Sequence, residues 1–250
     1  MQVIVDGLMT HYERNGSGKT VLLLHGWGDT HETFRAIADM LKGGFEVLAL
    51  DLPGFGKSAP PRNTWGLSDY ADFVAHFLSK VDAKHIYAVI GHSNGGAISI
   101  RALSSGVVKT DKLVLLSSAG IRGEYKGRIK AVRLVTKTGK LLTKPLPKSV
   151  KKRLRHTVYQ SVGSDMLVAE HLQETFKKVV SEDVQAEAPK VKAETLLIYG
   201  DNDTATPARY GERFAALLPH AHLEVLTDAG HFVHHDKPDT VDRLLVEFLR

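Results

Sequence analysis

One serine of the sequence stands in a run of small and polar residues, Gly91-His92-Ser93-Asn94-Gly95-Gly96. The run follows the apolar segment Ile86–Ile90 and precedes a helical pattern over Ala97–Leu103, which places Gly-x-Ser-x-Gly between a strand and a helix. Such a turn strains the serine backbone and brings other segments close, so its neighbours must lack side chains. These flanks favour a nucleophile over a chance match in a glycine-rich loop. We predict that Ser93 is this nucleophile, at a helix N-terminus that stabilises a developing anion.

A serine hydroxyl is a weak nucleophile unless a base takes its proton and an acid orients that base. Asp201 and Asp203 both follow a late apolar run, at the strand edge expected to carry Ser93. His231 comes after the last apolar run, and Gly230 before it lets the loop backbone approach the serine. We predict His231 as the base and, at this stage, either aspartate as the acid.

Several further histidines raise the question of a metal site or a different base. His231, His234 and His235 lack both the i, i+4 helical spacing and the Cys partner expected of a zinc site. We therefore predict no metal and no cofactor, with His234 and His235 as rival bases only. Others, such as His76 and His171, have the character of solvated surface residues.

An anionic tetrahedral intermediate needs two hydrogen-bond donors directed at its oxygen. The run His25-Gly26-Trp27-Gly28 follows an apolar strand pattern and offers the backbone amide of Trp27. The residue after the serine, Asn94, offers the second amide. The glycines of this run also suit a tight strand-to-helix turn, and the two interpretations are compatible.

A sheet must position these residues, because short apolar runs alternate with helical patterns along the chain. Asp6-Gly7 predicts an initial hairpin between Val3–Val5 and Met9–Tyr12. The runs expected to form strands are Val21–Leu24, Val47–Leu50, Ile86–Ile90, Leu113–Leu116, Leu196–Tyr199 and, more weakly, Leu223–Leu226. Helical patterns lie near Phe34–Leu41, Tyr70–Leu78, Gly95–Leu103, Tyr210–Leu218 and Thr240–Leu249. Continuous apolar strands between helices predict a mostly parallel sheet covered on both faces.

The alternation stops between Ile121 and about Pro189, where only helical patterns occur. Their apolar stripes are Ile129, Val132 and Val135, then Val150, Leu154 and Val158, then Leu172, Phe176 and Val179. We predict an α/β core of residues 1–120 and 190–250 with an all-helical insertion at 121–189.

The motifs together resemble the α/β-hydrolase superfamily, in its serine-nucleophile, esterase- and lipase-like branch with a helical cap. The matching segments are His25–Gly28, Asp51–Ser58 (Asp-x-Pro-Gly-x-Gly-x-Ser), Gly91–Gly96, Gly200–Pro207 (Gly-x-x-Asp-x-x-x-Pro) and Gly230-His231. The resemblance implies the α/β-hydrolase fold and makes residues 121–189 the cap, or lid, over the pocket. It favours Asp203 as the acid, while Asp201 suits turn stabilisation and stays the alternative. Asn94 departs from the Met, Leu or Gln more usual in the family.

Serine at the nucleophile position argues against the relatives that use Asp there, epoxide hydrolases and haloalkane dehalogenases. Acyl chemistry remains, and we predict a carboxylesterase acting on small-molecule esters of modest chain length. Lactonase is the nearest alternative, followed by thioesterase, aminopeptidase, carbon–carbon bond hydrolase and perhydrolase. A small-molecule receptor on the same fold is the non-enzyme alternative, which the filled triad positions disfavour.

The composition is that of a globular protein, with 250 residues, 43% hydrophobic and 24% charged residues, and no Cys. It excludes disordered, collagen-like and disulfide-rich classes, and the missing thiols leave Ser93 as the nucleophile. No apolar run reaches the roughly 18 residues of a membrane helix, and no signal peptide is visible. We therefore expect a cytoplasmic protein without a transmembrane segment.

The net charge of +5 is unevenly distributed. Thirteen Lys or Arg and one acid, Glu124, lie between Arg122 and Arg155, so this segment carries +12 and the rest of the chain −7. Solvated helix faces account for it most simply; attraction of acidic substrates and docking to anionic membranes are alternatives. Nucleic acid is not expected as a partner, because only Tyr125 and Tyr159 add aromatic rings and no reading motif is present. The sequence leaves the oligomeric state open.

Overall fold

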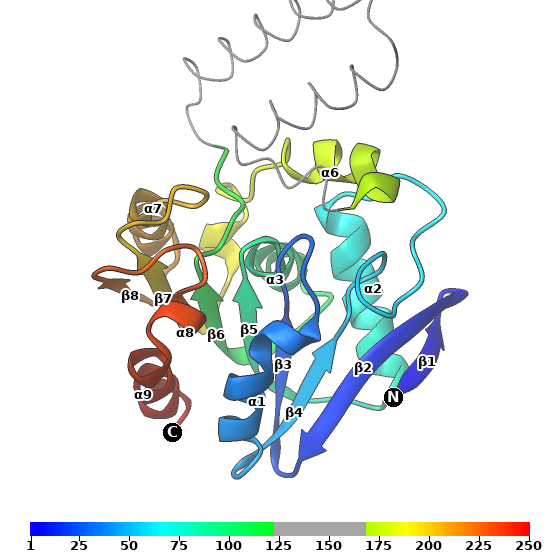
Figure 1. The fold of residues 1–250 in the computed structure, drawn as a ribbon, viewed down its shortest axis with the longest axis horizontal. Coiled ribbons are helices and arrows are strands. Elements are labelled where there is room, and N and C mark those ends of the chain that lie inside the picture. Colours follow the sequence, from blue (N-terminus) through cyan, green and yellow to red (C-terminus); the bar gives the residue numbers. More distant parts are fainter. Residues whose placement is uncertain (123–168) are drawn as a thin grey trace, which may run out of the picture.

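The computed structural model describes residues 1–122 and 169–250 (Figure 1). Most of the basic segment and the first two apolar stripes of the predicted insertion lie outside these residues. Among the described residues, no helix is both long and apolar enough to cross a membrane.

An eight-stranded sheet runs through the described part of the chain in the order β1-β2-β4-β3-β5-β6-β7-β8. Its strands are β1 (Gln2–Val5), β2 (Leu8–Gly16), β3 (Lys19–Leu24), β4 (Phe45–Leu50), β5 (Ile86–His92), β6 (Thr110–Leu116), β7 (Glu194–Gly200) and β8 (Ala221–Leu226). The pairs β1·β2 and β2·β4 are antiparallel and all others are parallel. The six predicted strand runs are confirmed, and so is the mostly parallel sheet.

The N-terminal hairpin forms at the predicted turn. Val5 pairs with Leu8, so Asp6 and Gly7 are the two loop residues, with φ of 51° and 76°. Two successive positive φ values match the right-handed twist of the strands, and Gly and Asp adopt them at low cost.

Helices cover both faces of the sheet, because successive strand residues point to opposite sides. The helices are α1 (Arg35–Leu41), α2 (Leu67–Lys80), α3 (Asn94–Ser105), α6 (Gln173–Val179), α7 (Ala208–Leu217), α8 (Val233–Asp236) and α9 (Pro238–Leu249). In β3, Leu22 and Leu24 join one core with α2, α3 and α7, whereas Val21 and Leu23 join a second core with α1 and α9. Short 3₁₀ turns are η1 (His31–Phe34), η3 (Glu170–Leu172) and η4 (Ala188–Lys190). The five helices predicted in the core are confirmed; the single turn α8 was not predicted.

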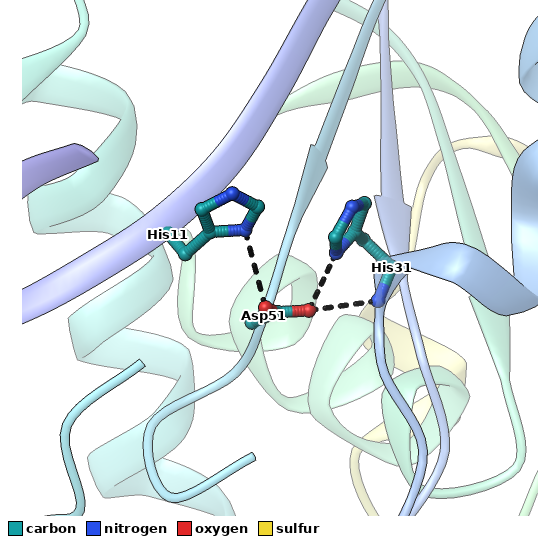
Figure 2. Close-up of side chains that lie close together, drawn as sticks. All are labelled: His11, His31 and Asp51. Atoms are coloured by element: carbon teal, nitrogen blue, oxygen red, sulfur yellow. Dashed lines mark hydrogen bonds and ion pairs between the residues drawn. The ribbon is translucent and has the colours of Figure 1, made fainter. Parts of the chain in front are cut away.

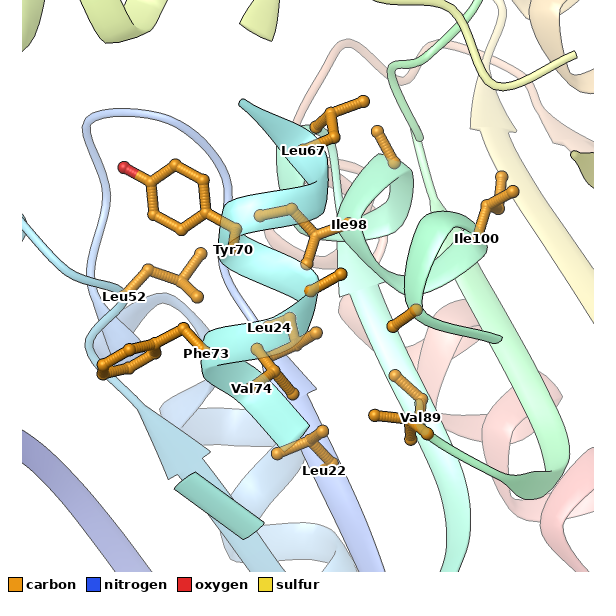
Figure 3. Close-up of a cluster of buried hydrophobic side chains, with 14 of the residues drawn as sticks. Leu22, Leu24, Leu52, Leu67, Tyr70, Phe73, Val74, Val89, Ile98 and Ile100 are labelled. Atoms are coloured by element: carbon orange, nitrogen blue, oxygen red, sulfur yellow. The ribbon is translucent and has the colours of Figure 1, made fainter. Parts of the chain in front are cut away.

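The first core depends on the apolar face of α2, shown in Figure 3. Tyr70, Phe73, Val74 and Phe77 recur at helical spacing and are each at most 1% exposed. The helix begins where the Asp69 carboxylate accepts a hydrogen bond from the Gly66 backbone N–H at 2.6 Å. Truncating a ring such as Phe73 would cost about 3–5 kcal/mol.

The described end of the predicted insertion is helical, as its third stripe indicates. In Figure 1, α6 lies above the carboxyl ends of the strands. Leu172 and Val179 are buried, and the Thr175 hydroxyl accepts a hydrogen bond from the Trp65 backbone N–H at 3.1 Å. A Cβ at Gly54 would meet Leu172 at 2.4 Å, so only glycine lets this turn pack there. The contacts hold α6 against the loop that precedes α2.

Candidate active site

Ser93 lies between β5 and α3 in a strained conformation, with φ of 50° and ψ of −115°. For a residue with a side chain, this backbone costs on the order of 1–3 kcal/mol. The surrounding glycines permit it: a Cβ at Gly91 would lie 2.7 Å from Gly96, and one at Gly95 would lie 2.0 Å from the Leu24 carbonyl oxygen. The turn therefore has the form expected of a nucleophile elbow.

Ser93, His231 and Asp203 form a continuous chain of hydrogen bonds. Ser93 Oγ lies 3.0 Å from His231 Nε2, and His231 Nδ1 lies 2.8 Å from Asp203 Oδ2. The three residues come from different loops at the carboxyl ends of β5, β7 and β8. The structure thus brings together the three side chains that the sequence selected, in the order that a serine nucleophile requires.

Asp203 is built to remain ionised and fixed. Burial opposes its ionisation, but hydrogen bonds from His231 and from Thr206 outweigh this and hold the pKa of the carboxyl below its ordinary value. Its Oδ1 accepts hydrogen bonds from the backbone N–H groups of Ala205 at 2.8 Å and Thr206 at 2.9 Å. The alternative acid, Asp201, is exposed, and its carboxylate accepts a bond from the Ala229 backbone N–H at 3.4 Å instead.

Sequence reasoning missed two side chains, those of His92 and Thr206, that hold this series of hydrogen bonds in place. His92 Nε2 lies 3.1 Å from the carbonyl oxygen of His231, and burial holds the pKa of His92 well below its ordinary value. A neutral His92 therefore donates Nε2–H to the loop that carries His231. The Thr206 hydroxyl lies 2.7 Å from Asp203 Oδ2 and 3.1 Å from His231 Nδ1. The sequence signals for these two residues were their positions, His92 beside Ser93 and Thr206 three residues after Asp203.

The loop with the predicted oxyanion donor Trp27 lies directly against the serine. A Cβ at Gly26 would meet the Ser93 Cβ at 3.2 Å, so glycine permits this close approach. His25 holds the loop: its Nε2 accepts a hydrogen bond from the Leu52 backbone N–H at 2.9 Å. Trp27 and Asn94 line the same pocket as Ser93, so their location is compatible with the predicted role of their amides as oxyanion donors.

The pocket at the serine has a volume of about 300 Å³ within the described residues. Trp27, Ala97, Ile121, Phe176 and Val179 are apolar residues on its wall, and Asn94, Glu182 and Tyr210 add polar groups. The Trp27 ring packs against Phe176 of α6, with ring centroids 5.1 Å apart. A segment of the predicted insertion therefore forms part of the wall, and the volume suits a small substrate.

Comparison with known protein families identifies the class of protein to which this fold and site belong. Residues 21–244 match the Alpha/beta hydrolase family, and the chain belongs to it. Hydrolysis is the class of reaction that this membership supports.

The individual relatives are distant. The chain is 26% identical over 263 residues to an uncharacterized hydrolase, YugF, of Bacillus subtilis, covering 98% of this chain and 96% of that protein. It is 27% identical over 273 residues to 2-hydroxy-6-oxononadienedioate/2-hydroxy-6-oxononatrienedioate hydrolase 1 of Pseudomonas putida, covering 98% and 94%. Among solved structures, a bacterial membrane phospholipase A superposes with a TM-score of 0.79 at 25% identity, covering all of this chain and 84% of that one.

Proposed function

We propose that the protein is a serine carboxylesterase that forms an acyl-enzyme on Ser93. The observation that supports it most strongly is the hydrogen-bond chain from Ser93 Oγ through His231 to the buried carboxylate of Asp203. A thiolate or a cofactor is not needed for this chemistry, because a positioned base activates the hydroxyl.

In the proposed reaction, Ser93 Oγ attacks the acyl carbon while His231 Nε2 takes the hydroxyl proton. The backbone amides of Trp27 and Asn94 stabilise the oxyanion. His231 then protonates the leaving alcohol, and a water that it deprotonates releases the acid from Ser93. Asp203 holds the Nδ1–H tautomer throughout and stabilises the imidazolium.

The pocket volume of about 300 Å³ and the apolar side chains on part of its wall support esters of modest chain length as substrates. Lactonase is the first alternative, because the same steps open a cyclic ester. The Pseudomonas putida relative supports carbon–carbon bond hydrolysis as a further alternative. Hydrolysis of thioesters and aminoacyl amides needs the same catalytic groups, so these compounds are tested as substrates as well.

We further propose that residues 121–189 form a cap over the pocket. Its described end supports this, since α6 contributes Phe176 and Val179 to the pocket wall. His171 adds a second anchor, with Nε2 3.0 Å from the carbonyl oxygen of Gly54.

A substrate panel tests the proposed function: p-nitrophenyl esters of increasing chain length, lactones, thioesters, aminoacyl anilides and a vinylogous diketone. Ser93→Ala is expected to lower turnover by about 10⁶-fold. Ser104→Ala is the matched control on α3, because its hydroxyl donates to the Arg101 carbonyl oxygen of the same helix, at 3.1 Å. Wild-type rates in Ser93→Ala would refute the assignment. Fluorophosphonate labelling of Ser93 without turnover of any substrate would favour a receptor instead.

A further inference from the structure

His31, at the start of η1, is a buried histidine that faces three carboxylates. Its Nδ1 lies 2.7 Å from Asp51 Oδ1, and its Nε2 lies 3.5 Å from Glu13 Oε1 and 3.6 Å from Glu32 Oε1. The residue is 6% exposed, and Nε2 is a buried atom without a hydrogen-bond partner in the described part of the chain. The proposed mechanism uses none of these groups.

The geometry around Asp51 decides which nitrogen of His31 carries the proton. Figure 2 shows the Asp51 carboxylate between His11 and His31. Asp51 also accepts hydrogen bonds from the backbone N–H groups of His31 and Lys57, both at 2.9 Å. As an acceptor at 2.7 Å, its Oδ1 requires that His31 Nδ1 donates a proton. In neutral His31, the Nε2 lone pair then faces the carboxylates of Glu13 and Glu32, which repel it unless a cation lies between them.

The contact distances differ between the Nδ1 side and the Nε2 side of the His31 ring. Two ligand atoms about 2.1 Å from a tetrahedral zinc ion lie about 3.4 Å apart. The separations of 3.5 and 3.6 Å on the Nε2 side match this value and are too long for good hydrogen bonds. The 2.7 Å contact on the Nδ1 side is a hydrogen bond and leaves no room for an ion. A carboxylate that holds the far nitrogen of a ligating histidine is the usual support of a metal site.

The Nε2 side also has space and a free ligand atom. A cavity of about 20 Å³ is lined by Glu13, His31, Glu32 and Arg35, which is enough for one water-sized ligand. Arg35 bonds Glu32 through Oε2, with Nε at 2.8 Å, so Oε1 stays available. Arg35, His31 and Lys57 act electrostatically on Glu32, and the Arg35 guanidinium bonds its Oε2, the oxygen that does not face His31 Nε2.

We propose that Glu13, His31 Nε2 and Glu32 bind one divalent transition-metal ion of the zinc class, with Asp51 holding the histidine ring. Imidazole and carboxylate together suit such an ion, and a water completes the coordination. The ion links β2 to η1, just after the oxyanion loop. The proposal differs from the sequence-based prediction that the protein binds no metal. The sequence carries no signal for this site, because Glu13 lies far along the chain from His31 and the three residues lack a metal-site spacing.

The test uses the untagged, metal-stripped full chain titrated with Co²⁺ and then Zn²⁺. We expect one Co²⁺ per chain, with the absorption of a tetrahedral ion that equimolar Zn²⁺ removes. Glu13→Gln/Glu32→Gln is expected to weaken Co²⁺ binding about 100-fold or more. Both glutamates are nearly half exposed, at 47% and 46%, so the variant is expected to fold. Zn²⁺ should raise the Tm of the wild type and not of this variant.

The matched control is His222→Gln/Glu224→Gln, which removes an exposed His–Glu contact of 2.7 Å on β8. We expect it to bind Co²⁺ as the wild type does. Unchanged affinity in the Glu13/Glu32 variant, or loss in the control, overturns the proposal. Absence of Co²⁺ absorption at a hundredfold excess also overturns it, and ¹⁵N shifts of an imidazolium at His31 would then show that a proton lies between the carboxylates.

Discussion

Asp203→Asn is expected to lower kcat/KM for a p-nitrophenyl ester by about 10⁴-fold while the protein stays folded. The structure determines how the new amide would lie. The Oδ1 position accepts two backbone N–H groups, from Ala205 and Thr206, at 2.8 and 2.9 Å. An amide oxygen can keep both bonds and an NH₂ group cannot. The NH₂ group therefore takes the Oδ2 position, which faces His231 Nδ1.

The magnitude follows from these contacts. The reversed amide would leave the buried Thr206 N–H unpaired, at about 1–3 kcal/mol, and would also lose the bond from the exposed Ala205 N–H, so the stated orientation is favoured by at least about 1–3 kcal/mol. Its NH₂ group makes His231 Nδ1 an acceptor, and the imidazole proton moves to Nε2. Nε2 then cannot take the proton of Ser93, 3.0 Å away. A 10⁴-fold loss corresponds to about 5.4 kcal/mol of transition-state stabilisation.

The assay compares steady-state hydrolysis and Tm of Asp203→Asn with those of Asp201→Asn. Asp201 is the matched control, because it is exposed in the same loop and accepts a long bond of 3.4 Å from the Ala229 backbone N–H. Asp201→Asn should keep kcat/KM within about twofold. The reasoning is refuted if Asp203→Asn keeps more than about a tenth of the wild-type value, or if both variants lose activity equally.

Three further outcomes are expected. Phe176→Ala removes part of the pocket wall and should raise KM for longer esters about tenfold with kcat nearly unchanged; a fall in kcat alone would contradict this. Gly95→Ala would place a Cβ 2.0 Å from a backbone oxygen and should cost at least about 3 kcal/mol in thermal unfolding, unlike Gly44→Ala, where the added Cβ meets no atom within 4 Å among the described residues beyond its chain neighbours. Acid should destabilise the protein, since burial lowers the pKa of His92 well below its ordinary value and that of His234 to about 3. In the unfolded chain these histidines take up protons near pH 6.5. Below that pH, each histidine therefore lowers the free energy of unfolding by up to about 1.4 kcal/mol per pH unit, until its pKa in the folded protein is reached. Equal urea-unfolding free energies at pH 6 and pH 4.5 would exclude this effect.

The local features of the fold could be predicted because neighbouring residues determine them. Asp6-Gly7 allows the hairpin turn whatever surrounds it, and the glycines beside Ser93 are needed by the turn itself. The apolar periods of strands and helices likewise depend on burial of one face or both. These signals predicted the strands, the core helices, and the serine, aspartate and histidine that the structure brings together.

The contacts between distant segments were decided only by the tertiary structure. Ser93 and His231 are 138 positions apart, and only their common motif order suggested that they meet. The support of His231 by the His92 ring, and the approach of Glu13 to His31, had no comparable signal. The sequence specifies which side chains are available, whereas sheet order and helix packing decide which of them face each other. For this protein, residue types and spacing determined the chemistry of the elbow, and the fold decided where a buried histidine would face three carboxylates.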